Sequence, residues 1–313
     1  MKPQDSKNTA HSSSATQTSE SADESLASLL ARLESTAVET KEEENVGFSR
    51  EELKSIITGL EDDITSGRWI KSYYADTDLR MMPALVEQAN RKYPEMHLKL
   101  AMTPEDLSLS LKEMIDAGVH SSRHIVNSGS SRIHFAVLDH QTIDNKTSFI
   151  LYEPTAFHHK SAAILGLRTE QAIQDCQLPN CHFSMVEMDI QRSSSECGIF
   201  SLALAKKLYR ESDKLTRMHK DNINGVLNKT HLTLPSEKVD PYLPASFYKH
   251  TQGRRRLREY IKSNPEAEHE KVNKKDETLS ERFHKNLVET EGKTVSVSLH
   301  RKRVSEYKST LAL

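Results

Sequence analysis

The segment Met188-Asp-Ile-Gln-Arg-Ser-Ser-Ser-Glu-Cys-Gly-Ile-Phe-Ser-Leu-Ala-Leu-Ala-Lys-Lys207 is the stretch around which the rest of the chain is organised. It begins as the end of a predicted strand and passes through the polar run Ser193-Ser194-Ser195. Cys197 stands where an apolar helical pattern begins. Apolar residues occupy nearly every side of this helix, which favours a buried position. They are Ile199, Phe200, Leu202, Ala203, Leu204 and Leu208.

Cys197 is a candidate nucleophile because it stands at the start of that helix. The helix dipole and the unpaired backbone N–H groups of a first turn both favour a thiolate. Gly198 leaves room for a substrate backbone to approach, and Gln191 can direct its side-chain amide toward the sulfur as an oxyanion donor. A lone cysteine is, however, commonly a buried structural residue. This segment alone therefore leaves a nucleophile and a structural thiol equally open.

Composition excludes several classes of protein. The chain has 313 residues and a net charge of −2. No apolar run approaches the roughly 20 residues of a membrane helix, and the start Met1-Lys-Pro-Gln-Asp-Ser6 lacks the apolar region of a cleaved secretory signal. The three cysteines are too few for a disulfide framework and indicate a reducing environment. Cys176, Cys181 and His182 lack the second ligand pair that zinc requires, so we expect no metal.

The amino-terminal segment differs from the rest in composition. Residues 1–45 hold nine acidic and four basic side chains, a net charge of −5, which leaves +3 for the remainder. The first aromatic residue is Phe48, and a segment this polar cannot bury enough apolar surface to fold alone. Leucines 26, 29, 30 and 33 share one helical face. A helix that docks on a partner and an incidental helix both remain open there.

Helix and strand signals start at Ser49. Ser49-Arg-Glu-Glu52 is a capping-box pattern, and Thr103-Pro104-Glu-Asp106 is a second helix start with proline at the first helical position. Apolar periodicity predicts helices over 82–91, 161–175 and 212–227. Strands are predicted over 97–101, 122–127, 133–139, 147–153 and 182–189. Short turns join the three central strands, which predicts an antiparallel meander.

A cysteine nucleophile needs a base, and the base needs a group that orients it. His134 lies near the start of one strand of the predicted meander, and Glu153 ends the next strand just before Pro154. In a hairpin these two positions lie side by side, so an imidazole–carboxylate pair forms without any long-range assumption. A buried, hydrogen-bonded core histidine is the alternative for His134 alone. The joint order of His134, Glu153, Gln191 and Cys197 favours catalysis.

Three basic runs follow the core. They are Lys249, His250, Arg254, Arg255, Arg256 and Arg258; then Lys271, Lys274 and Lys275; and finally His300-Arg301-Lys302-Arg303. Runs of this kind are usually solvated faces, but three in one region can converge on a polyanion. No aromatic interleaving or nucleic-acid-reading module accompanies the charge, so nucleic acid is not an expected partner.

The order of His134, Glu153, Gln191 and Glu196-Cys-Gly-Ile-Phe200 resembles the clan of ubiquitin-like-protein and adenovirus cysteine peptidases. Longer stretches resemble the YopJ family of bacterial type III effectors, in its YopJ/AvrA-like branch, from about Phe48 to the end. They include Met81-Met-Pro-Ala-Leu-Val86, Lys92-Tyr-Pro-Glu95, Cys181-His-Phe-Ser-Met-Val-Glu-Met-Asp-Ile-Gln-Arg-Ser-Ser-Ser-Glu-Cys-Gly-Ile-Phe200 and Phe247-Tyr-Lys-His-Thr-Gln-Gly253. Arg132 and Ala136 stand where that family usually has Gly and Ser.

This resemblance implies an α+β fold. We expect a papain-like, ubiquitin-like-protease-like core with a mixed, largely antiparallel sheet flanked by helices, plus a helical regulatory region. The expected parts are a disordered secretion and translocation segment (1–47), the N-terminal helical part of the regulatory region (48–118), the catalytic core (119–230) and a basic C-terminal regulatory region (231–313).

The resemblance also implies the chemistry. His134 would be the base, Glu153 its orienting group, Gln191 an auxiliary oxyanion donor and Cys197 the thiol that carries acetyl from acetyl-CoA. Acceptors would be Ser or Thr hydroxyls, or Lys amines, on host signalling kinases such as MAP kinase kinases, with IκB kinase as a further candidate. A protein of this family would be secreted by a type III system and act in the host cell cytoplasm.

In that family, host inositol hexakisphosphate activates the enzyme by binding a basic pocket. The basic runs supply the candidate residues, and Lys249 is also the candidate for autoacetylation. The candidates are Lys249, His250, Arg254, Arg255, Lys274, Lys275, Arg301 and Lys302.

Two other functions fit the same residues. A cysteine peptidase that removes ubiquitin or a ubiquitin-like modifier would also form a thioester on Cys197, made from an isopeptide and resolved by water. A non-catalytic module would merely occupy host kinases. The residues of the triad are chemically intact, which favours an enzyme, but they do not choose between acetyl transfer and proteolysis.

Overall fold

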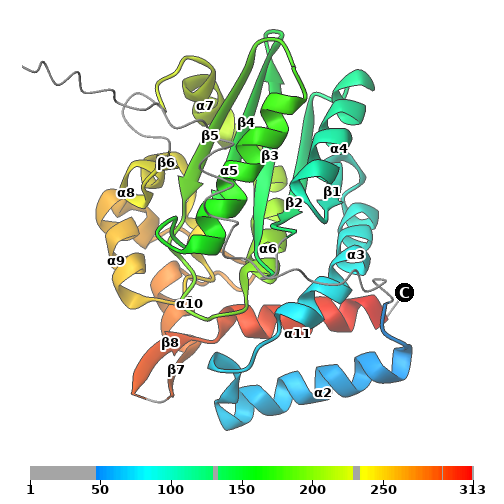
Figure 1. Cartoon of the computed structure of the whole chain (residues 1–313). Coiled ribbons are helices and arrows are strands. Elements are labelled where there is room, and N and C mark those ends of the chain that lie inside the picture. The colour runs from blue at the N-terminus through cyan, green and yellow to red at the C-terminus, as the bar shows by residue number, and fades with distance from the viewer. Residues whose placement is uncertain (1–46, 130–132, 228–232, 291, 312–313) are drawn as a thin grey trace, which may run out of the picture.

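A computed structural model describes residues 47–129, 133–227, 233–290 and 292–311. The leucine face at residues 26–33, Arg132 and, apart from Gly47, the predicted disordered segment lie outside these ranges. A six-stranded sheet with strands in sequence order forms the centre of the described structure (Figure 1). Its strands are β1 (Leu98–Ala101), β2 (Ser121–Asn127), β3 (Phe135–Ile143), β4 (Lys146–Glu153), β5 (Cys181–Glu187) and β6 (Thr233–Leu234).

The sheet is mixed, as predicted, but it is not largely antiparallel, since three of its five described strand pairings are parallel. β2, β3 and β4 form the expected antiparallel meander, with Val137 opposite Tyr152 in the hairpin that leads to the candidate pair. β1 joins one edge in parallel, and β5 and β6 extend the other edge in parallel. Residues 98–101, which the sequence grouped with the first helical part, therefore belong to the sheet of the core.

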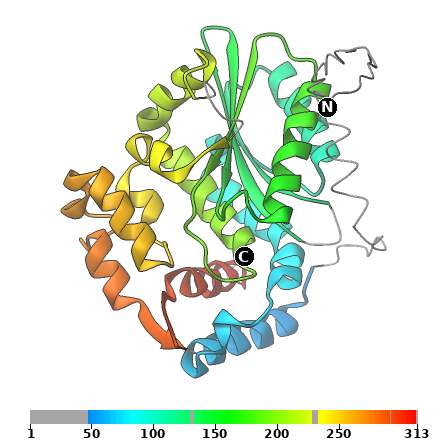
Figure 2. The same cartoon turned by 60° about the vertical axis from the view of Figure 1, so that its left-hand side comes forward.

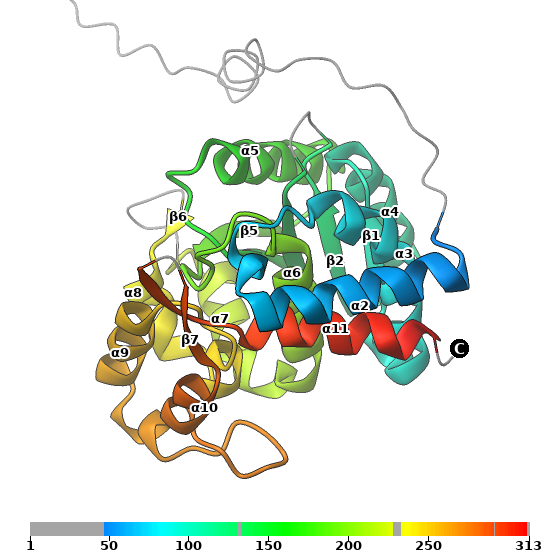
Figure 3. The ribbon, with the colours of Figure 1, turned by 90° about the horizontal axis from the view of Figure 1, so that it is seen from below.

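Helices cover both faces of the sheet (Figure 3). α4 (Pro104–Asp116) and α5 (Lys160–Asp175) lie on one face, while α6 (Cys197–Arg210) and α7 (Ser212–Ile223) lie on the other. Strand alternation divides the core between them: Phe135 and Val137 pack with α6, whereas Ala136 and Leu138 pack with α4 and α5. Each large apolar side chain buried in this way contributes about 1.5–3 kcal/mol.

The predicted helix starts are confirmed. The Ser49 side chain caps α2 (Arg50–Ser66) in a reciprocal capping box with Glu52, and Gly67 ends the helix at a φ of 75°. Thr103 and Asp106 form the same box at α4. Each such cap contributes about 1 kcal/mol, so these residues fix where the two helices begin.

α3 (Ala75–Lys92) begins seven residues earlier than apolar periodicity indicated. The added turns carry Asp76 and Asp78, which break the apolar pattern. Asp78 is nevertheless buried, because it pairs with Arg303 from the far end of the chain. A tertiary ion pair, which periodicity does not detect, therefore extends this helix.

The carboxyl-terminal part is a cluster of short elements at one side of the sheet (Figure 2). Its elements are α8 (Ser236–Val239), α9 (Arg254–Ser263), α10 (Leu279–Lys285), β7 (Leu287–Thr290), β8 (Lys293–Ser296) and α11 (Ser298–Leu311). Short 3-10 turns complete the described chain at Arg68–Ile70, Pro94–Met96, Asp240–Tyr242, Ala245–Tyr248 and Pro265–Glu268. α11 packs beside α2 and also contacts α3 and α6 (Figure 3), so the first and last helices of the described chain lie side by side.

Candidate active site

The hairpin of β3 and β4 brings His134 and Glu153 together. His134 lies one residue before β3, and Glu153 is the last residue of β4. The distance between His134 Nε2 and Glu153 Oε2 is 2.8 Å, and both side chains are buried. Because Nε2 faces the carboxylate, Nδ1 is the ring nitrogen left for the sulfur of Cys197.

Neighbouring residues hold both members of this pair. Thr155 donates to Glu153 Oε1 from its backbone nitrogen at 2.8 Å and from its hydroxyl at 2.6 Å. The backbone nitrogen of His134 donates to Asn127 Oδ1 at 3.3 Å, and its carbonyl accepts from Ser128 N at 2.9 Å. Both carboxylate oxygens of Glu153 are therefore engaged, which fixes the orientation of the imidazole.

The electrostatics of the pair favour a protonated imidazole. Burial disfavours the charged ring, but the Glu153 carboxylate and the neighbouring Cys197 sulfur outweigh it and raise the pKa of His134 well above its ordinary value. His134 is therefore an imidazolium at neutral pH, ready to donate a proton.

Cys197 is the first residue of α6, where the sequence placed it, and only 4% of its surface is exposed. The first intrahelical bond of α6 runs from Phe200 N to Glu196 O at 2.9 Å. The N–H groups of Cys197, Gly198 and Ile199 consequently have no acceptor inside the helix, and they can bind developing negative charge at the sulfur or on a substrate.

Gly198 serves packing rather than substrate access. A Cβ atom there would lie 3.0 Å from Met82 Cε, 3.2 Å from Phe135 Cδ2 and 3.4 Å from Asp78 Cβ. These atoms belong to α3 and β3, so the space beside Gly198 is filled by protein. The expectation that this glycine admits a substrate backbone is therefore wrong: its small size allows α6 to approach α3 and the sheet.

Gln191 is buried in the segment that precedes Cys197. Its Nε2 donates to the carbonyl of Ser193 at 2.8 Å, which leaves the second N–H of that amide for an oxyanion. Its Oε1 is buried without a partner among the described residues. The amide thus shapes the 191–193 turn, and its role as an oxyanion donor remains a prediction.

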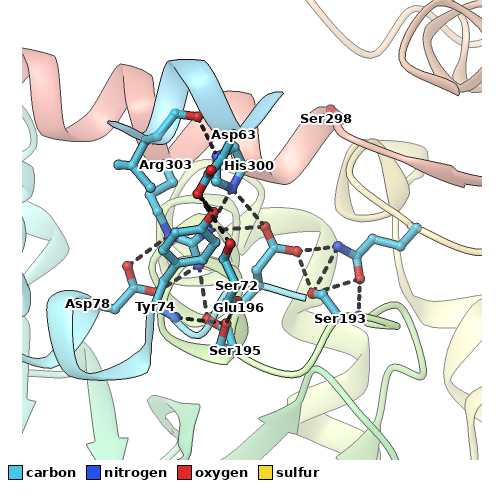
Figure 4. Close-up of polar contacts among 12 residues, drawn as sticks. Asp63, Ser72, Tyr74, Asp78, Ser193, Ser195, Glu196, Ser298, His300 and Arg303 are labelled. Atoms are coloured by element: carbon cyan, nitrogen blue, oxygen red, sulfur yellow. Dashed lines mark hydrogen bonds and ion pairs between the residues drawn. The ribbon is translucent and has the colours of Figure 1, made fainter. Parts of the chain in front are cut away.

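A buried polar network that the sequence did not indicate holds the residues just before Cys197 (Figure 4). Arg303 of α11 donates to Asp78, to Glu196 and to the carbonyl of Ser195. Gln252 donates to Glu196 from the other side. Gln252 lies in one of the stretches quoted above, but Arg303 was counted only as part of a basic run, and nothing in the sequence marks it as buried.

Two basic cavities lie along α11: α3 and α6 also line the inner one, and α10 also lines the outer one. The inner cavity has a volume of about 290 Å³, and Ile190 and Phe200, which lie close to Cys197 in the sequence, are among the residues that line it. Its cationic side chains are Lys92, Lys206, Lys207, Arg210, Lys249 and Lys302. The outer cavity has a volume of about 480 Å³, and its cationic side chains are Lys274, Lys275, Arg282, Lys285, Arg301 and Lys302.

Six of the eight predicted anion-binding residues line these two cavities. Lys249, His250 and Lys302 line the inner cavity, and His250 and Lys302 also line the outer one. Lys274, Lys275 and Arg301 line the outer cavity. Arg254 and Arg255 line neither; they open α9, and the Arg255 side chain is 77% exposed and pairs with Glu259. The structure does not bring these two arginines together with the other six.

Burial and neighbouring positive charges lower the pKa values of Lys249 and His250. Burial, followed by the charges of Lys207 and Lys302, lowers the pKa of Lys249 to about 7. Burial and the neighbouring Lys249 lower the pKa of His250 well below its ordinary value, so this imidazole is neutral. His250 Nδ1 lies 2.8 Å from the hydroxyl of Ser298, and its Nε2 is buried without a partner within the described ranges. His250 can therefore contribute a hydrogen bond to an anion, but not a charge.

Within the described ranges, no three His, Cys, Asp or Glu side chains gather as a metal site would require. Cys176 and Cys181 are free thiols. A search of the described residues also finds no helix long and apolar enough to cross a bilayer.

Comparisons with known proteins identify relatives along most of the chain. The family model described as YopJ Serine/Threonine acetyltransferase matches residues 53–309. Serine/threonine-protein acetyltransferase YopJ of Yersinia pestis is 56% identical over 264 residues, which cover 84% of this chain and 92% of that protein. The Yersinia pseudotuberculosis protein of the same name gives the same values.

Solved structures agree with this match. A structure of AvrA with IP6 and CoA has a TM-score of 0.81 and 53% identity, and covers 84% of this chain and 99% of that chain. HopZ1a in complex with IP6 and CoA has a TM-score of 0.66 at 17% identity, with 84% and 98% covered, which shows a shared fold. The predicted family and the helix-flanked mixed sheet are both confirmed. The chain belongs to the YopJ family of serine/threonine acetyltransferases.

Proposed function

We propose that this protein transfers acetyl from acetyl-CoA, through a thioester on Cys197, to Ser and Thr hydroxyls or Lys amines of host signalling kinases. The observation that carries the proposal is a thiol at a helix start whose first N–H groups have no acceptor inside the helix, in the same buried centre as the His134–Glu153 pair. Such a site has a nucleophile, a proton carrier and an oxyanion-binding helix end.

In the first step the Cys197 thiolate attacks the acetyl carbonyl of acetyl-CoA. The negative charge on the carbonyl oxygen is stabilised by the N–H groups at the start of α6, with the second N–H of Gln191 as a further donor. The C–S bond to CoA then breaks, and the His134 imidazolium gives its proton to the departing thiolate. Acetyl-Cys197 and a neutral His134 remain.

In the second step neutral His134 takes the proton of the acceptor hydroxyl while the hydroxyl oxygen attacks the thioester. The Cys197 thiolate leaves, which restores the starting charges of both residues. Glu153 stays ionised throughout and stabilises the imidazolium that forms in this step. Thr155 holds that carboxylate in place through both steps.

The two basic cavities support a donor site and an activator site. The inner cavity combines apolar side chains, Ile190, Phe200 and Phe247, with several cations, so it suits the mixed surface of CoA. The outer cavity is lined mainly by polar and cationic side chains, so it suits a compact polyanion such as inositol hexakisphosphate. Lys302 lines both, which makes it a direct link between donor and activator.

The family match supports a proposal about where the protein acts and which proteins it modifies. We infer secretion by a type III system, action in the host cell cytoplasm, and MAP kinase kinases as acceptors whose activation is blocked, with IκB kinase as a further candidate. Lys249 is the candidate for autoacetylation, since an amine with a pKa of about 7 is partly neutral, and therefore nucleophilic, at physiological pH.

The test is a transfer assay with pure protein, labelled acetyl-CoA, inositol hexakisphosphate and a MAP kinase kinase. We expect label on the kinase with wild type, none with Cys197→Ala, and a rate on the order of 100-fold lower with Glu153→Gln. Cys176→Ala is the matched control, because Cys176 is also buried but packs on the opposite face of the sheet. Label that persists in Cys197→Ala would overturn the proposal.

The same preparations separate the two alternatives. Cleavage of a ubiquitin–fluorophore substrate at an ordinary enzymatic rate, lost in Cys197→Ala, would favour a peptidase. Equal suppression of kinase activation by wild type and Cys197→Ser would favour a non-catalytic module.

A further inference from the structure

Arg303 is completely buried and touches the segment that carries the nucleophile. Its Nε and Nη2 atoms donate to the two oxygens of Asp78 at 2.9 and 3.0 Å. Nη2 also donates to the carbonyl of Ser195 at 3.0 Å, and Nη1 donates to Glu196 Oε1 at 3.2 Å. One guanidinium from α11 thus holds the two residues that immediately precede Cys197 (Figure 4).

The opposite side of Glu196 is also held. Its Oε2 accepts from the hydroxyl of Ser193 and from Nε2 of Gln252, while Gln252 Oε1 accepts from Ser193 N at 2.9 Å. On the other flank, the Ser195 hydroxyl accepts from Tyr74 N at 3.1 Å. The turn 193–196 is therefore fixed by the side chains of Arg303 and Gln252 and by the backbone N–H of Tyr74.

Charge balance gives Arg303 a second role. Asp78 and Glu196 are both 1% exposed, and Glu196 immediately precedes Cys197, so an unpaired charge on its buried carboxylate would oppose formation of the thiolate. Burial raises the pKa of Glu196, and the Arg303 charge is the largest effect that opposes it. His300, whose pKa burial lowers to about 4, faces this group as a neutral ring and adds no charge.

We propose that Arg303 is a positioning residue for Cys197: from α11 it locks the Ser195–Glu196 turn and neutralises the carboxylate of Glu196, the residue that immediately precedes Cys197. Arginine is required, since its planar fork reaches two carboxylates and a carbonyl at once, whereas the compact ammonium of lysine cannot. The proposal rests on the proposed role of Cys197 as the nucleophile.

The chain contains a matched control. Arg256 of α9 is 1% exposed, pairs with Asp240 at 2.9 Å and donates to the carbonyl of Met188 at 3.0 Å. It therefore holds the same segment nine residues upstream of Cys197, and it has no contact with a carboxylate beside the thiol. Arg256→Lys tests what loss of a buried guanidinium does in general.

The experiment measures alkylation of Cys197 by iodoacetamide across pH in the full chain, with peptides quantified by mass spectrometry and Cys176 as the internal reference. We expect Arg303→Lys to shift the pH profile of Cys197 upward by about one unit, which is about tenfold in rate at pH values below the midpoint of the profile. Arg256→Lys should leave the profile unchanged. No acetyl donor is needed, so the result is independent of whether acetyl transfer is the reaction.

Glu196→Gln provides a second variant that keeps the Arg303–Asp78 pair, should Arg303→Lys fail to fold. It removes the negative charge beside the thiol, so its profile should shift downward, opposite to that of Arg303→Lys. Asp240→Asn is its matched control and should cause no shift. The proposal is overturned if the folded variants at 303 and 196 keep the wild-type profile, or if the controls shift equally.

Discussion

Helices α9 and α11 are anchored by similar buried ion pairs, but only the ion pair of α11 also contacts a residue next to Cys197. Each buries one arginine against a carboxylate, Arg256 on Asp240 and Arg303 on Asp78. Each carboxylate also accepts from a buried tyrosine hydroxyl at 2.6 Å, and each arginine donates to a backbone carbonyl of the 188–197 segment. Only Arg303 reaches a second carboxylate, that of Glu196. The two arginines are therefore anchored alike, but only Arg303 contacts the residues just before Cys197.

The outward faces of the two helices differ as well. Arg301 and Lys302 of α11 point into the basic cavities, whereas Arg254 and Arg255 of α9 line neither. In each helix, the run of basic residues thus contains one buried arginine, which anchors the helix, and other basic side chains that face outward. The outward charges can bind a polyanion only where other elements of the fold form a cavity together with them.

Removal of the anchors should have the largest effect. Arg303→Met and Arg256→Met should each lower the free energy of unfolding by about 3–5 kcal/mol, because a buried carboxylate is left without its partner. Urea denaturation measures both, with the exposed Arg255→Met expected to change it by less than about 0.5 kcal/mol. If one anchor proves dispensable, the two clusters are not equivalent supports.

Charge reversal on the outward face should weaken ligand binding strongly for α11 and only slightly for α9. Lys302→Glu should weaken binding of inositol hexakisphosphate by roughly 100-fold, because Lys302 lines both cavities. Arg255→Glu on α9 should change it less than about twofold, since it lies outside them. Calorimetric titration of both variants decides the matter, and an equal loss in each would place α9 at the anion site after all.

Loss of a single tyrosine hydroxyl should have a smaller and matched effect. Tyr307→Phe and Tyr248→Phe each remove one hydrogen bond to a buried carboxylate, so each should cost about 1.5–2 kcal/mol of stability. Denaturation curves for the two variants should nearly coincide. A cost confined to Tyr307→Phe would show that the α11 cluster depends more on its hydroxyl.

The smallest expected effect concerns pH. Lys249 has a pKa of about 7 in the free protein, and a bound polyanion favours its charged form, so binding takes up a proton. Lys249 lines the inner cavity, which we assign to CoA, so affinity for CoA should fall by up to about tenfold between pH 6 and pH 8, relative to Lys249→Met. In that variant only the titration of the phosphates themselves remains. Parallel pH dependence in the two proteins would exclude Lys249 from the site.

Residues close in sequence explain what could be predicted about the site. His134 and Glu153 lie on adjacent strands of one hairpin, so strand alternation and a short turn were enough to pair them. Cys197 was placed at its helix start by the onset of an apolar pattern. Gly198 was misjudged because its neighbours, Met82 and Phe135, come from distant elements.

The network before Cys197 could not be predicted for the same reason. Asp78 and Arg303 are 225 positions apart, and neither carries a local signal of burial. Glu196 lay in the quoted motif, but its partners Gln252 and Arg303 become neighbours only when α11 packs between α2 and α6.

The sequence alone determined the family, the candidate nucleophile Cys197, its candidate base His134 and the existence of a basic carboxyl-terminal region, because these depend on residue identity and on contacts across one turn or hairpin. The tertiary structure decided which cations share a cavity, which arginines are buried and what holds the turn before Cys197. Those outcomes depend on how distant helices pack, since the partner of a buried charge comes from wherever the fold brings an opposite one.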